Sequence, residues 1–162
     1  MWTRIFSAIL AISAAVMVCF TLYAAGWTRS IGDPVAAVNG YEYVSHVSWL
    51  FLLISTCVLL VLANAGYWTR NRLWTMWATF IYFAVFAALR YFGLEPSVFE
   101  FRKEHGLSDA SFTAKPFLAV ILILAMAAIV FANQLILIRL RAKAYPEPKS
   151  TIDSETDKDI SD

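Results

Sequence analysis

Four long runs of apolar residues, separated by shorter polar segments, set the pattern of this chain. They cover Ile5–Gly26, His46–Gly66, Leu73–Phe92 and Phe117–Ile138. A helix rises about 1.5 Å per residue and the hydrocarbon core of a bilayer is about 30 Å thick, so about 20 apolar residues cross it. The pattern therefore predicts an all-α membrane protein whose four transmembrane helices form an antiparallel bundle.

The connections between the first three runs differ in length. Only Gly66–Arg72 separates the second run from the third, so these two helices are expected to form an antiparallel hairpin. The first connection is longer and contains Gly-Asp-Pro at positions 32–34 and Asn-Gly at 39–40. Both sequences are typical of turns, so we expect the second helix to begin near His46.

The third connection, Gly93–Pro116, is the largest segment between the apolar runs. It contains a candidate helix from Pro96 to His105, with a proline at its start and Gly106 just past its end. We expect a short extramembrane helix in this loop.

The pattern divides the chain into a four-helix transmembrane domain over residues 1–143 and a tail over residues 144–162. Near its start the tail has prolines at positions 146 and 148, and Ser, Thr and acidic residues without periodicity follow. Such a segment buries too little apolar surface to offset the entropy of ordering. We therefore predict a disordered acidic tail.

Composition supports the membrane assignment and limits the classes of partner that we expect. Hydrophobic residues make up 60% of the chain and charged residues 15%, whereas soluble domains carry about 25% charged residues. The net charge is +1, which argues against nucleic acid as a ligand. The predicted partners are the lipid bilayer together with other integral membrane subunits or further copies of this chain.

The distribution of basic residues predicts the orientation. With the N-terminus inside, the cytoplasmic flanks carry one more Lys or Arg than the outer flanks, and several lie close to span ends, where such residues bias topology. These cytoplasmic cations are Arg4, Arg70, Arg72, Arg139, Arg141 and Lys143. We therefore predict a protein of the bacterial-type inner membrane with both termini in the cytoplasm.

Small and polar residues in the spans are candidates for helix contacts. Inside lipid, helices associate through close packing of small residues and through hydrogen bonds rather than through burial from water. The sequence suggests that the following residues line helix contacts, within one chain or between chains: Ser7, Ala11, Ala15, Ala84, Ala88, Ala128, Ala132, Asn133 and Gln134.

The middle thirds of all four runs contain no Asp, Glu, Lys, Arg or His. Such residues mark proton relays and ion paths in membranes. The motifs of three four-helix families are also missing: the first-helix carboxylate of small multidrug exporters, the Cys-x-x-Cys pair of vitamin K epoxide reductases, and the paired intramembrane histidines of b-type cytochromes. The two cysteines, Cys19 and Cys57, are expected to serve only in packing.

One group of residues at the outer mouth of the second helix remains a candidate for chemistry. Glu42 and His46 are four positions apart and would share a helix face, and Arg90 at the end of the third span would approach them. These three residues would suit a metal or a quinone headgroup. The simpler interpretation is an interfacial ion pair that anchors the helix ends, so we predict no cofactor.

These observations favour a non-catalytic integral membrane subunit that scaffolds a larger complex for electron transfer, photosynthesis, secretion or transport. One alternative is a small homo-oligomeric channel or transporter, with Asn64, Thr79, Asn133 and Gln134 lining a polar path. A second alternative is a quinone- or metal-handling membrane protein that uses Glu42, His46 and Arg90.

Overall fold

The computed structural model describes residues 1–30, 32–107 and 116–146. These residues are almost entirely helical, and no strand occurs among them. The helices, in chain order, are α1 (Trp2–Ser30), α2 (Pro34–Arg70), α3 (Trp74–Ala88), the π-helix η1 (Leu89–Leu94), α4 (Glu95–Glu104) and α5 (Pro116–Ala144).

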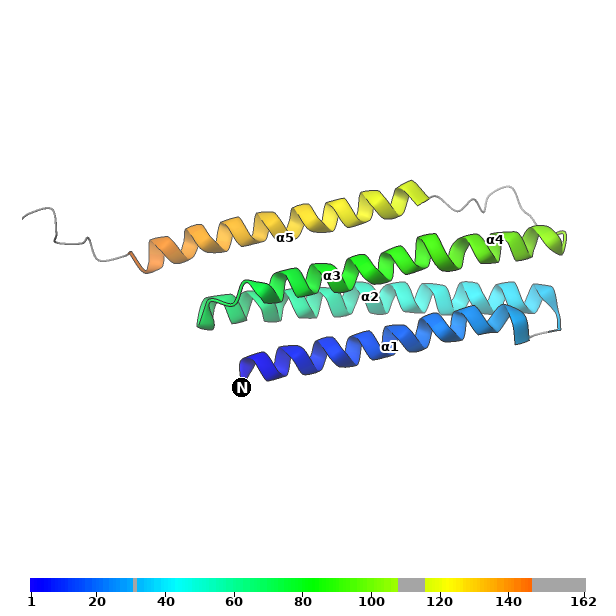
Figure 1. The fold of residues 1–162 in the computed structure, drawn as a ribbon, viewed down its shortest axis with the longest axis horizontal. Coiled ribbons are helices and arrows are strands. Elements are labelled where there is room, and N and C mark those ends of the chain that lie inside the picture. The colour runs from blue at the N-terminus through cyan, green and yellow to red at the C-terminus, as the bar shows by residue number, and fades with distance from the viewer. Residues whose placement is uncertain (31, 108–115, 147–162) are drawn as a thin grey trace, which may run out of the picture.

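The long helices lie side by side and alternate in direction along the chain (Figure 1). Helix α2 packs between α1 and α3, and α5 packs mainly against α3. As a result, α1 and α5 lie on opposite sides of the α2–α3 pair (Figure 1). Among the described residues, four helical segments are long and apolar enough to cross a membrane, as the sequence predicts.

Helix α2 begins much earlier than His46, the start that the sequence suggests. Its first residue is Pro34, and the carboxylate of Asp33 caps the helix by accepting a hydrogen bond of 3.0 Å from the backbone N–H of Val35. The turn predicted at Asn39-Gly40 is therefore wrong, because both residues lie within α2. The apolar residues on either side of this pair maintain the helix despite its low intrinsic propensity.

The helix predicted at Pro96–His105 is present, as α4, but it continues directly from the third span. The chain passes from α3 through η1 into α4 without a break, which corrects the expectation of a loop starting at Gly93. A proline inside a helix removes one N–H donor and crowds the carbonyl four residues earlier. The wider turns of η1 end just before Pro96 and include Phe92, whose carbonyl would otherwise be crowded.

The hairpin between α2 and α3 is as tight as its sequence predicts. Asn71 adopts the left-handed conformation, with φ of 52°, and its N–H donates to the carbonyl of Tyr67 at 2.9 Å. Asparagine tolerates this conformation better than most residues and commonly ends helices in this way.

The interface of α1, α2 and α3 forms the main core. Phe6, Leu52, Leu59, Met76 and Phe83 are among its buried side chains, and Val130 joins it from α5. The buried hydroxyl groups of Ser55, Tyr82 and Thr79 are hydrogen-bonded within the chain. This matters because an unpaired polar group in hydrocarbon costs several kcal/mol. The hydroxyls of Ser55 and Tyr82 lie 2.8 Å apart, and Thr79 donates to the carbonyl of Thr75 at 2.9 Å.

The small-residue stripes of α1 and α5 lie on outward faces. Ser7, Ala11 and Ala15 are exposed, as are Ala128 and Ala132, whereas Ala84 and Ala88 of α3 are partly buried. Inside the chain, α1 presents Phe6, Ser13 and Met17 instead. Phe6 and Met17 belong to the core that α1 shares with α2 and α3.

Residues 147–162, which make up most of the tail that the sequence predicts to be disordered, lie outside the described residues.

Candidate functional site

Two helical segments extend beyond the length needed to cross the hydrocarbon core of a bilayer. They pack together at one end of the molecule. Helix α2 has 37 residues, which corresponds to about 55 Å, whereas the hydrocarbon core measures about 30 Å. Its first part, residues 34–48, packs beside α4 and is hydrogen-bonded to Arg90 of η1. We call these two segments, residues 34–48 and 89–104, the helical head.

A small apolar cluster of its own stabilises the helical head. Tyr41 and Val44 of α2 pack with Val98 of α4 and with Ala24 near the end of α1, and all four are buried. Phe20 and Leu94 cover the edges of this cluster. The head is therefore a packed unit that is continuous with the transmembrane helices.

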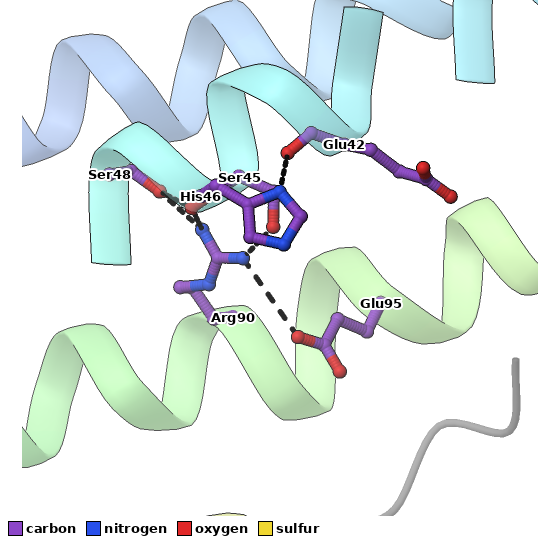
Figure 2. A network of polar contacts seen from close by, with 6 residues as sticks. All are labelled: Glu42, Ser45, His46, Ser48, Arg90 and Glu95. Atoms are coloured by element: carbon purple, nitrogen blue, oxygen red, sulfur yellow. Dashed lines mark hydrogen bonds and ion pairs between the residues drawn. The ribbon is translucent and has the colours of Figure 1, made fainter. Parts of the chain in front are cut away.

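The central polar feature of the head is the side chain of Arg90, which is only 3% exposed. Its guanidinium donates to the carbonyl of Ser45 at 3.1 Å and to the hydroxyls of Ser45 and Ser48. The carboxylate of Glu95 lies 3.9 Å from it (Figure 2). A buried charge is tolerated only with such partners, so this network fixes η1 against α2.

Local helix geometry explains how the network assembles. Ser45 and Ser48 are three residues apart and therefore share the face of α2 that meets Arg90. The ring of Trp49 lies beneath the guanidinium, 5.0 Å from its carbon to the ring centroid, which adds a cation–π contact. Two buried polar atoms, Arg90 Nε and the Tyr41 hydroxyl oxygen, have no hydrogen-bond partner among the described residues.

A second ion pair in the helical head joins α4 to α2. Arg102 of α4 donates to the carboxylate of Glu42 at 2.7 Å. The Glu42 side chain is 40% exposed, so this pair contributes less to stability than a buried one would.

The three candidate residues of the sequence, Glu42, His46 and Arg90, lie near one another but serve different contacts. The side chain of Glu42 extends away from Arg90 (Figure 2) and binds Arg102. His46 is exposed, and its Nδ1 lies 2.8 Å from the backbone carbonyl of Glu42 rather than from its carboxylate. The three side chains therefore do not converge on one ligand position.

The network also includes residues that the sequence did not single out. Ser45, Ser48 and Arg102 become partners because α2 begins early and because α4 continues α3. Ser45 and Ser48 are three residues apart, which places both on one face of a helix. This spacing is the feature of the sequence that could have indicated them as partners of Arg90. In the part of the chain that the structure describes, no three His, Cys, Asp or Glu side chains come together as a metal site requires.

A separate polar contact joins α5 to α2 within the apolar region. The amide of Asn133 donates to the side-chain oxygen of Asn64 at 2.6 Å. The neighbouring Gln134 has a buried side-chain oxygen with no hydrogen-bond partner among the described residues. Asn133 thus links the side chains of α5 and α2 by a direct hydrogen bond.

Replacing Asn133 with leucine should weaken the attachment of α5 modestly, because Asn64 loses its partner. Interhelical hydrogen bonds in membranes contribute about 0.6 kcal/mol on average and about 1.7 kcal/mol at most. A double-mutant cycle of Asn64→Leu and Asn133→Leu in unfolding experiments should give a coupling energy of about this size. A coupling energy near zero would contradict the role of this contact.

Comparisons of this chain with protein-family models, with characterised proteins and with solved structures gave no match.

Proposed function

We propose that this chain is a non-catalytic integral membrane subunit that scaffolds a larger membrane protein complex. The observation that carries the proposal is the position of the small-residue stripes. Ser7, Ala11 and Ala15 on α1 and Ala128 and Ala132 on α5 face outward, and these two helices lie on opposite sides of the α2–α3 pair (Figure 1).

Small residues at four-residue spacing allow helix backbones to approach closely in lipid, where dispersion contacts drive association. Because these stripes are not used inside the chain, they are available to helices of neighbouring subunits. A subunit with two such faces can bridge partners on both sides.

The environment of the polar residues supports this role over the two alternatives. Thr79, a residue of the proposed channel path, is fully buried and donates to its own helix, and Asn133 pairs with Asn64. Glu42 and Arg90 form ion pairs within the helical head, Glu42 with Arg102 and Arg90 with Glu95. The channel and the quinone- or metal-handling hypotheses therefore have less support, although flux and ligand-binding assays remain their direct tests.

We place the protein in a bacterial-type inner membrane with both termini in the cytoplasm. In this orientation the helical head projects from the outer surface, where it offers a rigid contact for extramembrane parts of the same partners. The support is the distribution of Lys and Arg along the sequence.

Gentle solubilisation of native membranes, followed by native-gel separation and mass spectrometry, tests the proposal. We expect the chain to migrate with other membrane subunits in fixed stoichiometry. Recovery of this chain alone in a small band would exclude the scaffold role.

Two enlarged variants and two matched controls locate the contact. Ala11→Leu and Ala132→Leu add bulk to the outward stripes and should release the chain from the complex. Ile12→Leu and Ile129→Leu change residues that are already large and exposed on the same helices, and they should leave the complex intact. Equal behaviour of all four variants would show that the stripes are not the contact.

A further inference from the structure

The acidic side chains of the described residues are confined to one end of the molecule, where they lie together with Arg90, Arg102 and Lys103. The acidic residues Asp33, Glu42, Glu95, Glu100 and Glu104 all lie in or next to the helical head. The opposite end contains the start of α1, the α2–α3 turn and the end of α5 (Figure 1). Among residues 1–30, 32–107 and 116–146, the charged side chains at this end are all basic: Arg4, Arg70, Arg72, Arg139, Arg141 and Lys143.

A narrow slot opens at this basic end, between α1 and the α2–α3 hairpin. Arginine and threonine side chains line this slot together with apolar ones. The residues that define it include Trp2, Thr3, Phe6, Leu62, Arg70 and Arg72. The slot has a volume of about 10 Å³, which is the space of one water molecule, so a charged headgroup can lie only at its mouth.

The two arginines that line the slot are exposed and close together in the chain. Arg70 ends α2 and Arg72 follows it in the tight turn, with Asn71 in the left-handed conformation between them. By contrast, Arg141 at the same end is already engaged, because it donates to the carbonyl of Tyr67 at 2.7 Å and lies over the Tyr67 ring.

We propose that Arg70 and Arg72 bind the phosphate of an anionic phospholipid at the mouth of this slot. Guanidinium groups suit phosphate oxygens because they offer several donors in a planar fork. Trp2 also lines the slot, and it offers apolar surface to the part of the lipid next to the phosphate.

The location of the slot identifies a lipid as the occupant. Trp2, Trp68, Trp74 and Trp77 gather at this end, and tryptophan prefers the headgroup level of a bilayer. The slot therefore opens where lipid phosphates lie, beside an apolar surface that continues into the membrane. Cations near an anionic membrane surface each contribute about 1 kcal/mol of attraction.

Lipid binding to the full-length chain in nonionic detergent, measured by native mass spectrometry, tests this proposal. Phosphatidylglycerol should bind as a single preferred adduct, and phosphatidylcholine should bind much more weakly. The double variant Arg70→Gln/Arg72→Gln should weaken phosphatidylglycerol binding about 30-fold. Both side chains are exposed, so the variant is expected to fold.

The matched control is Arg139→Gln/Lys143→Gln, which removes the same charge from exposed residues at the same end. It should leave phosphatidylglycerol binding within about twofold, because these residues do not line the slot. Equal losses in the two double variants would overturn the proposal in favour of diffuse attraction. The acidic segment 147–162 follows α5. If phosphatidylglycerol bound specifically only after this segment was removed, Arg70 and Arg72 would instead be the binding partners of the segment in the full-length chain.

Discussion

Replacing Glu95 with glutamine is expected to lower the free energy of unfolding by about 3 kcal/mol. The change removes the negative charge 3.9 Å from Arg90 and leaves a cation that is only 3% exposed with neutral partners. Removal of one partner of a buried ion pair typically costs about 3–5 kcal/mol. We expect the lower end, since Ser45 and Ser48 still accept hydrogen bonds from the guanidinium. Detergent-induced unfolding followed by tryptophan fluorescence measures the change.

Glu100→Gln is the matched control for Glu95→Gln. Glu100 lies on the same helix but is exposed, so its loss should change stability by less than about 0.5 kcal/mol. The double variant Arg90→Met/Glu95→Gln should recover part of the lost stability, because no unpaired charge remains in the head. If Glu95→Gln and Glu100→Gln behaved alike, the serines alone would account for the stability of buried Arg90.

Replacing Leu59 with alanine is expected to cost about 2–4 kcal/mol, because the side chain is fully buried in the core. Its loss leaves a cavity that α1 and α3 can fill only by moving. The same unfolding measurement reports the change.

Leu53→Ala provides a control in the same helix and of the same residue type. Leu53 is 51% exposed and lies within the apolar span, so lipid chains can replace the contacts that alanine loses. We expect a cost below about 1 kcal/mol for this variant. Similar costs at Leu53 and Leu59 would mean that α2 does not present the face described here to α1 and α3.

The transmembrane segments follow from the sequence alone because membrane insertion depends on local composition. Each of the four apolar runs lies in a helix that is long and apolar enough to cross a membrane. The ends of these helices were harder to predict. Asn39-Gly40 is typical of a turn, yet it lies inside α2, where Val38 and Tyr41 are buried. Packing against α1 and α4 outweighs the weak local preference for a turn.

The candidate site was only partly predictable for the same reason. The sequence indicated Glu42, His46 and Arg90 as neighbours at a helix mouth, and they do lie in one region. Their actual partners depend on the continuity of α3, η1 and α4, which places Glu95 beside Arg90 and Arg102 beside Glu42. No local pattern encodes a contact between residues 60 positions apart.

The sequence by itself determined that this is an all-α chain with four membrane-spanning candidates and a tight α2–α3 hairpin. These properties depend on hydrophobicity, helix rise and turn chemistry, which act over about 20 residues or fewer. The tertiary structure alone decided which faces are buried. It placed the stripe of Ala11 and Ala15 outward and buried Arg90, because burial depends on how helices distant in sequence pack against one another.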